Sequence, residues 1–286
     1  TNIVIINHAL LIADIQSPGI LTEHRTVIIH EDHNLVDTAY KQMEKSISAY
    51  PMKAAIDNVN PEGKSSTRWK GQLIFVAQKV DSLKGIIDDL IKLASGCKET
   101  VDTLFQELEF NVSNRFDPSA KYSEKYIIYN LTEEYGVFLN EINMLMSDIN
   151  ALIIKLNKIS LELRSYNGDT EDFSETIIQI DSFIESLNTI LTLLNLLTQE
   201  QDSNWVYWQE GVFRNNGEFE LIIYGSPIDI SKNLVDAFFS HVDHCILTSA
   251  TLRVDESFDY FFSRTGLDTK EIEKVYSGVY PSPFYY

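Results

Sequence analysis

The chain contains, at residues 27–35, the stretch Val27-Ile28-Ile29-His30-Glu31-Asp32-His33-Asn34-Leu35. Its three consecutive β-branched residues are typical of a parallel strand that is covered on both faces. In open α/β sheets, ligands bind at the carboxyl ends of such strands. The stretch therefore predicts a strand that carries the polar residues 30–33 to a candidate ligand site.

A similar segment lies near the other end of the chain. The predicted buried strand Cys245-Ile246-Leu247-Thr248 is followed by Ser249-Ala250-Thr251-Leu252. A further apolar run, Ile3 to Ile6, also predicts a buried strand, and residues 255–265 predict a helix. Because strands at both ends of a chain can join a single sheet, we expect one interrupted α/β domain rather than three consecutive domains.

The middle of the chain has a different periodicity. Apolar side chains alternate at spacings of three and four over residues 73–108, 131–163 and 173–194, which predicts three long helices, the first bent at Gly85 or Gly96. Their short connections predict antiparallel neighbours in a bundle. Residues 50–71 are polar and contain Pro, Gly, Ser and Lys, so we expect an irregular segment there.

The composition limits the classes of protein to consider. A net charge of -19 argues against strong binding of nucleic acid by the chain alone. No apolar run reaches the roughly 18 residues that a membrane span needs, so we expect no membrane partner and a cytoplasmic location. The two cysteines, Cys97 and Cys245, lack the spacing of a metal site and are expected to be buried thiols.

Together, residues 30–33 and 249–251 resemble the DEAH-type second motif and the Ser-Ala-Thr third motif of DinG-type, XPD-like helicases of superfamily 2. In that family the Glu of the second motif polarises the attacking water, and the third motif couples the nucleotide state to the grip on DNA. The resemblance implies that Glu31, His33, Ser249 and Thr251 are catalytic residues.

The second motif departs from the family pattern at its first position. His30 stands where the family has the Asp that holds the magnesium ion, and a neutral imidazole is a poor ligand for this hard cation. The resemblance still places His30, Glu31 and Asp32 at the cofactor, with Glu31 and Asp32 as the candidate magnesium ligands. Asp32 would face the same side as His30 if the strand stayed extended.

Three further stretches resemble segments of the same helicases. Asn2 to Leu11 is similar to the segment before the second motif, Pro227 to Ser231 to the segment before the third, and Pro281 to Phe284 to the passage into the second motor domain. The resemblance implies an α/β fold class: residues 1–40 and 202–286 form part of a RecA-like motor domain with a parallel sheet. Residues 41–201 then correspond to the family's helical arch insertion.

The phosphate-binding loop of such motors is absent from the sequence. Gly63-Lys64-Ser65 lacks the earlier glycine and the preceding strand, so we expect a flexible loop there. The chain is therefore interpreted as an internal piece of a longer helicase. The complete protein is expected to use ATP and magnesium and to bind single-stranded DNA, whereas the piece alone is expected to bind no cofactor, to hydrolyse no ATP and to bind DNA weakly or not at all.

Several alternatives remain open from the sequence. Residues 30–33 could simply cap the following helix, or His30 and His33 could bind zinc together with His24. The complete protein could be a 3'-5' exonuclease with a degraded motor, since His30 disrupts the motor motif. The chain could also belong to a non-enzymatic scaffold, with the acidic helices as a coiled-coil arm.

Overall fold

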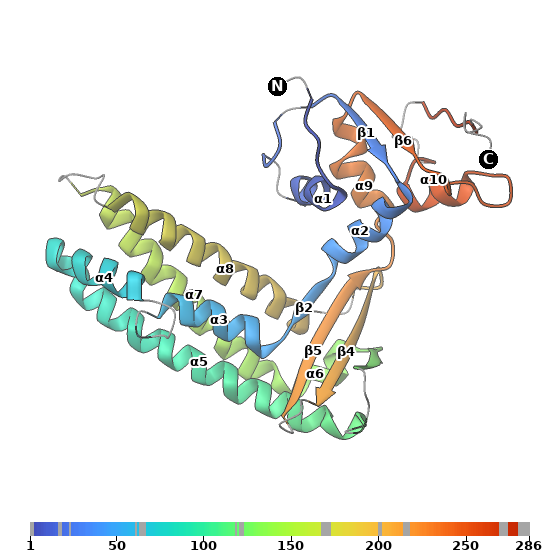
Figure 1. Ribbon diagram of the computed structural model, residues 1–286. Coiled ribbons are helices and arrows are strands. Elements are labelled where there is room, and N and C mark those ends of the chain that lie inside the picture. The colour runs from blue at the N-terminus through green and yellow to red at the C-terminus, as the bar shows by residue number, and fades with distance from the viewer. Residues whose placement is uncertain are drawn as a thin grey trace. The chain divides into compact units, whose positions relative to one another are not determined.

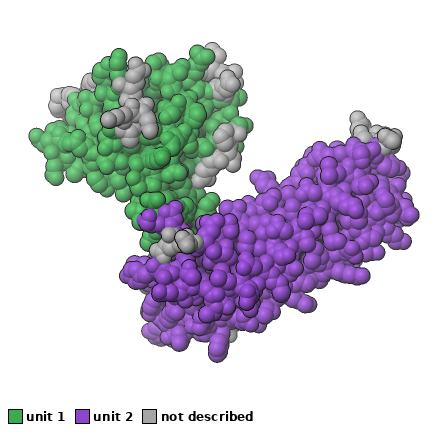
Figure 2. All heavy atoms as spheres, turned by 180° about the vertical axis from the view of Figure 1, so that it is seen from behind, with its two compact units in different colours: residues 1–45, 204–206, 226–286 green, residues 46–203, 207–225 purple. Residues whose placement is uncertain are grey.

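The computed structural model describes residues 3–16, 19–22, 24–60, 62, 67–117, 119, 123–166, 173–199, 202–213, 218–268 and 274–279. The chain divides into two compact units, which Figure 2 distinguishes by colour. Unit 1 comprises residues 1–45, 204–206 and 226–286, and unit 2 comprises residues 46–203 and 207–225. Sequence segments from both ends of the chain thus fold together in unit 1.

Unit 1 is an α/β unit built on a parallel pair of strands. β1 (Thr26–His30) pairs with β6 (His244–Thr248) in a register that places Ile28 opposite Ile246 and His30 opposite Thr248. The helices of this unit are α1 (His8–Gln16), α2 (His33–Met43), α9 (Ser231–Ala237) and α10 (Asp259–Thr265). The parallel pairing confirms that strands from the two ends of the chain join one sheet.

The two faces of this strand pair have different surroundings. Ile29 is buried, and Val27, Cys245 and Leu247 pack beside it against a core of apolar residues from α1, α2 and α9. On the opposite face, the side chain of Ile28 is 68% exposed. The sequence prediction of a strand covered on both faces is therefore wrong for the described residues, because the helices of unit 1 cover one face only.

The predicted first strand, Ile3–Ile6, is not a strand in the structure. No described segment pairs with it, and Ile3 and Ile5 are 78% and 93% exposed. Apolar sequence alone does not make a strand, because the backbone also needs a neighbour for its hydrogen bonds. The described sheet of unit 1 consists of β1 and β6.

Unit 2 is dominated by long helices. α7 (Leu139–Arg164) packs against both α5 (Lys84–Val112) and α8 (Ser174–Thr198), and α3 (Ala49–Val59) packs against α5 and α8 (Figure 1). Pairs of contacts fix the directions of the helices. Between α3 and α5, Lys53 bonds to Asp102 and Asp57 to Lys98, so the residue numbers rise in one helix as they fall in the other and the two helices are antiparallel. The contacts of Asp89 with Lys155 and of Thr100 with Asp148 show in the same way that α5 and α7 are antiparallel.

Two of the three predicted helices are each divided in two. The first becomes α4 (Thr67–Lys79) and α5, separated by the 3-10 turn Asp81–Leu83, and the second becomes α6 (Leu131–Tyr135) and α7, separated by Gly136–Phe138. The first break falls at Val80, whose φ of -126° and ψ of 87° leave the helical region. Gly85 and Gly96 lie inside α5, so the break is not at a glycine.

The expectation of an irregular segment at residues 50–71 is wrong for most of that range. α3 spans Ala49–Val59, and its apolar residues Met52, Ile56 and Val59 are buried. Pro51 falls in the first turn of the helix, where proline is tolerated because the first amides have no partner within the helix. The proline therefore marks a helix start rather than a loop.

A second sheet, with the strand order β2-β5-β4-β3, belongs mostly to unit 2; residues 45, 205–206 and 226–227 at the ends of its strands are part of unit 1. Its strands are β2 (Lys45–Ile47), β3 (Glu124–Ile128), β4 (Trp205–Phe213) and β5 (Phe219–Pro227). Residues 207–225 were expected in the motor-like part, whereas in the structure they belong to unit 2. The reason is their pairing, since β4 is hydrogen-bonded to β3 in an antiparallel register.

Two helical stretches of unit 2, Leu131–Arg164 and Ser174–Thr198, are long and apolar enough to cross a membrane by length and composition alone. This is weak support for a membrane protein, because the core helices of soluble bundles meet the same criteria. The buried residues of α7, Ile142 to Leu163, face neighbouring helices of the bundle. Two segments with a predicted role lie outside the described residues. They are Gly63-Lys64-Ser65, expected to be a flexible loop, and Pro281 to Phe284, which resembles the passage into the second motor domain.

Candidate functional site

The two motif segments meet at the carboxyl ends of β1 and β6. The last residue pair in the register is His30 with Thr248. Just after the end of β1, the Asp32 amide donates a hydrogen bond of 3.2 Å to the Thr248 carbonyl. Parallel strands end at the same edge, so residues that follow β1 lie beside residues that follow β6. This local pairing brings together segments that are more than 200 residues apart in the sequence.

Glu31 forms a sharp turn between β1 and α2. Its φ of 55° lies in the left-handed region, which is uncommon for a residue other than glycine. α2 begins two residues later at His33. The turn therefore ends the strand at His30 and places the His33 side chain at the amino end of the helix, beside the segment that follows β6.

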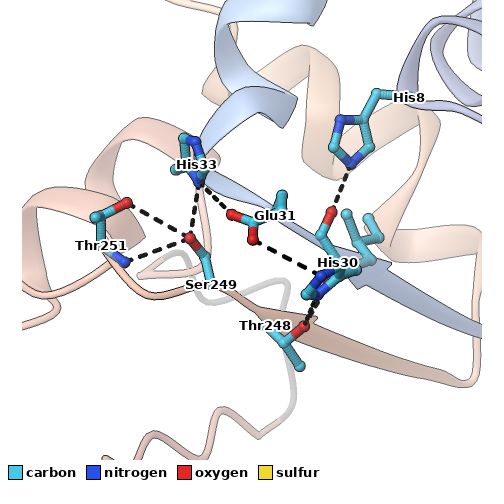
Figure 3. A network of polar contacts seen from close by, with 8 residues as sticks. His8, His30, Glu31, His33, Thr248, Ser249 and Thr251 are labelled. Carbon is cyan, nitrogen blue, oxygen red and sulfur yellow. Dashed lines mark hydrogen bonds and ion pairs between the residues drawn. The ribbon is translucent and has the colours of Figure 1, made fainter. Parts of the chain in front are cut away.

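The centre of the site is the His33 imidazole. Its Nδ1 lies 2.8 Å from the Ser249 hydroxyl and 3.1 Å from Oε2 of Glu31 (Figure 3). The contact with Ser249 is a hydrogen bond whose donor depends on the imidazole tautomer, and the contact with Glu31 is an ion pair when the imidazole is protonated. One imidazole thereby joins the second-motif glutamate to the third-motif serine.

Thr251 extends this network on the β6 side. Its amide donates to the Ser249 hydroxyl at 3.4 Å, and its own hydroxyl lies 3.5 Å from that of Ser249. The structure thus brings Glu31, His33, Ser249 and Thr251, the four predicted catalytic residues, into one chain of polar contacts (Figure 3).

His30 lies at the edge of the same network. Its Nδ1 is 3.2 Å from the Thr248 hydroxyl, and its Nε2 is 3.7 Å from Oε1 of Glu31. The His30 side chain is 80% exposed. Glu31 therefore has an imidazole near each carboxylate oxygen, and its own side chain is 48% exposed.

Two contributors to this site, His8 and Thr248, were not predicted from the sequence. His8, the first residue of α1, places its Nε2 3.0 Å from the His30 carbonyl, and Thr248 bonds to His30 through its hydroxyl. The sequence did offer one indication of a role for His8, because residues 2–11 resemble the helicase segment before the second motif. Its partner could not be predicted, because the contact is with a backbone atom whose direction depends on the turn at Glu31.

Asp32 points away from these residues. Asp32 was expected to face the same side as His30 if the strand stayed extended. The strand does not stay extended, because Glu31 adopts a left-handed backbone conformation. Its side chain is completely buried, and neither carboxylate oxygen has a hydrogen-bond partner. Burial raises the pKa of Asp32 to about 7. Burial also raises the pKa of the nearby Cys245 thiol to about 12, with a smaller contribution from the charge of Asp32.

The donor set fits the expected magnesium–nucleotide group only in part. At the exposed edge, Glu31 offers oxygen ligands of the kind that magnesium prefers, and this cation often takes only one or two carboxylates from a protein. His30 offers nitrogen, and the Asp32 carboxylate lies in the core. Among the described residues, no three His, Cys, Asp or Glu side chains form a metal-binding group, and this includes the zinc alternative with His24.

Comparison with known proteins gives a limited match. No family model matches the chain. The chain is 30% identical over 113 residues to the protein named 3'-5' exonuclease DinG of Bacillus subtilis (strain 168), a match that covers 36% of this chain and 12% of that protein's length. The chain thus corresponds to a small part of this relative. The similarity supports a distant relation to DinG proteins.

Proposed function

We propose that the chain is part of a DinG-like, ATP-dependent DNA helicase that acts in repair or replication, and that the ends of β1 and β6 form part of its nucleotide site. In this proposal unit 1 belongs to a RecA-like motor domain and unit 2 is an arch-like insertion. ATP, magnesium and single-stranded DNA are the ligands of the complete protein.

The observation that carries the proposal is the contact between His33 and Ser249 at 2.8 Å. A motor must transmit the state of its nucleotide site to other parts of the protein, and a bonded pair that joins two strand ends is suited to this. The parallel pairing of β1 and β6 supports the same proposal, since both motifs follow the carboxyl ends of paired parallel strands, and ligands of open α/β sheets bind at such ends.

Each side chain at this edge has a role in the proposal. The bound nucleotide supplies a phosphate chain that water can attack. Glu31 polarises that water as a general base, which requires an ionised and accessible carboxylate. His33 orients the Glu31 carboxylate through its 3.1 Å contact. When the Glu31 carboxylate moves, the His33 imidazole moves with it and shifts Ser249 through the 2.8 Å contact. Thr251 holds the Ser249 hydroxyl from the other side.

The test is a substitution in the complete protein that contains this chain. Glu31→Gln keeps the size of the side chain and removes its basicity, so we expect DNA-stimulated ATP hydrolysis to fall by about a hundredfold or more. Glu44→Gln is the control, because Glu44 is exposed just beyond α2 and outside the polar network. Equal rates for the two variants would overturn the proposal.

A second candidate is a nuclease whose motor part is weakened. The matched relative is named as a 3'-5' exonuclease, and His30 replaces the magnesium-binding Asp of the motif that this chain resembles. In this alternative, His30→Asp in the complete protein raises DNA-stimulated ATP hydrolysis, because a carboxylate is a better ligand for magnesium than imidazole. An unchanged rate would show that the motor is not impaired at residue 30.

The non-enzymatic scaffold remains the competing class. It predicts that Glu31→Gln, His30→Asp and Glu44→Gln leave ATP hydrolysis equally low, while removal of unit 2 abolishes a protein contact. The ATPase measurements on the Glu31 and His30 variants therefore also distinguish the motor from the scaffold.

A further inference from the structure

The turn at Glu31 has a conformation that a glutamate rarely adopts. Its φ of 55° lies in the left-handed region, where the side chain crowds the backbone. In this conformation Oε2 of Glu31 lies 3.1 Å from the His33 imidazole. A strained backbone persists only where the surrounding structure holds it. The contacts that hold this turn therefore decide where the Glu31 carboxylate lies.

Two planar peptide groups meet at the Glu31 Cα, and their orientations set its φ and ψ. The group that follows Glu31 is held by main-chain atoms at both ends. Its oxygen, the Glu31 carbonyl, accepts a hydrogen bond of 3.0 Å from the Asn34 amide. Its nitrogen, the Asp32 amide, donates to the Thr248 carbonyl at 3.2 Å. Main-chain donors and acceptors remain in place when a side chain is replaced.

The peptide group that precedes Glu31 is held by a side chain. Its oxygen is the His30 carbonyl, and Nε2 of His8 lies 3.0 Å from this oxygen (Figure 3). A carbonyl oxygen only accepts hydrogen bonds, so Nε2 carries the hydrogen of this bond. Rotation of the peptide group would change the φ of Glu31 and would also break the bond to His8.

His8 itself stands on an anchored helix. It is the first residue of α1, and its side chain is half-buried. Leu11 and Ile12, one turn further along α1, are buried in the core of unit 1. The Gln42 side chain of α2 donates a hydrogen bond of 3.0 Å to the Ala9 carbonyl. The start of α1 is thereby fixed, and the His8 imidazole has a firm base.

We propose that His8 is a positioning residue for Glu31. By donating to the His30 carbonyl, its imidazole holds the peptide group before Glu31 and keeps the Glu31 carboxylate beside His33. Without this bond the turn relaxes toward a negative φ, and the carboxylate moves away from the imidazole. The importance of His8 for catalysis rests on the proposed function, in which Glu31 is the general base. The positioning itself does not depend on that function.

The geometry favours positioning over a chemical role for His8. Its Nε2 is occupied by a main-chain carbonyl. In the part of the chain that the structure describes, no three His, Cys, Asp or Glu side chains form a metal-binding group, so His8 belongs to no such group there. A bond that only stabilised unit 1 is the competing interpretation, and it predicts that Glu31 stays in place when His8 is replaced.

Nuclear magnetic resonance of the chain itself tests the positioning without nucleotide. At a fixed pH, the ring signals of His33 depend on whether a carboxylate lies beside the ring, and Glu31→Gln shows how they change when that carboxylate is removed. His8→Ala should shift the His33 signals in the same direction. His8→Gln should leave them unchanged, because its amide reaches about as far as the imidazole Nε2 and is also a donor. His8→Asn has the same amide on a shorter side chain and should behave like His8→Ala.

Gln42→Ala is the matched control, because it removes the bond to the Ala9 carbonyl and leaves the bond between His8 and His30 intact. It should leave the His33 signals unchanged. Thermal unfolding shows whether each variant is folded, and the comparison of His8→Gln with His8→Asn suffices if His8→Ala unfolds. Equal signals for His8→Gln and His8→Asn, or an equal shift in Gln42→Ala and His8→Asn, would overturn the proposal.

ATP hydrolysis by the complete protein separates this proposal from the proposed function. His8→Ala and His8→Asn should lower kcat about tenfold and leave the KM for ATP nearly unchanged, because a misplaced general base slows the chemical step more than binding. His8→Gln should restore most of the rate. If Glu31→Gln does not affect hydrolysis but the His33 signals follow the His8 variants, the proposed function fails and the positioning stands. If Glu31→Gln lowers the rate and the His8 variants change neither kcat nor the His33 signals, the positioning alone is wrong.

Discussion

The replacement of Asp32 by Ala should change how the stability of unit 1 depends on pH. Asp32 is completely buried without a hydrogen-bond partner, and burial raises its pKa from 3.8 to about 7. Between these values the folded chain holds a proton that the unfolded chain has released. The folded state is therefore progressively destabilised as pH rises from about 4 to 7, and the full loss persists at higher pH.

The size of the effect follows from the difference between the two pKa values. Three units correspond to about 4 kcal/mol in total, at about 1.4 kcal/mol per unit. About 2.5 kcal/mol of this is lost between pH values of about 5 and 8, because the unfolded carboxyl is already ionised at the lower value. Asp32→Ala removes this pH-dependent loss. Between the lower and the higher pH, the free energy of unfolding of the variant should therefore rise by about 2.5 kcal/mol relative to that of the unsubstituted chain.

Calorimetric and urea unfolding at the two pH values measures this difference, and the cost of the small cavity left by Ala cancels because it does not depend on pH. Asp37→Ala, at an exposed position of the same helix, is the control and should keep the original pH dependence. If Asp32→Ala and the unsubstituted chain lose stability equally between the two pH values, the argument from burial is refuted.

Three further outcomes are expected. Gly266→Ala should destabilise unit 1 by about 1–3 kcal/mol in thermal unfolding, since Gly266 has a φ of 79° and a Cβ there would lie 2.6 Å from Cγ2 of Val235; an unchanged melting temperature would contradict this. Leu152→Ala, in the buried seam of α7, should cost unit 2 about 2–5 kcal/mol, whereas Ile178→Ala at a 68% exposed position should cost about 0.5 kcal/mol or less. In fluorescence anisotropy at physiological salt, the chain alone should bind single-stranded DNA with a Kd weaker than about 100 µM, and tighter binding would show that the net charge is a poor guide.

The helical seams were the most predictable part of the fold. Ile142, Leu145, Ile149 and Leu152 were expected to line one side of a helix, and all four are completely buried. A periodic seam is a local property of the sequence, so it can be recognised without knowledge of the partner helix. The break at Val80 was not predicted, because both sides of it continue the same apolar spacing.

Strand predictions depended on partners that the sequence does not reveal. β1 and β6 formed where apolar runs were found, but the equally apolar Ile3–Ile6 stayed out of the described sheet. β3 was missed, and its residues Tyr126 and Ile127 are exposed at the edge of a sheet, where no strong alternation of apolar and polar residues is required. The pairing of a strand is decided by segments far away along the chain.

The contact between the two motif segments could be predicted from the sequence, whereas its geometry could not. Glu31, His33 and Ser249 were selected from two short motifs, and the structure places them in contact. The direction of Asp32 was decided by the left-handed backbone at Glu31. No sequence pattern indicates a positive φ at a glutamate. The burial of the neighbouring Asp32 could therefore be found only from the structure.

The most direct test of the account is a double-mutant cycle across the contact of His33 with Ser249, measured as DNA-stimulated ATP hydrolysis by the complete protein. If the two strand ends work as one site, His33→Ala and Ser249→Ala each lower the rate, and the double variant is no slower than the slower single variant. If the two effects multiply instead, or if neither single variant lowers the rate, the ends of β1 and β6 do not form a joint nucleotide site.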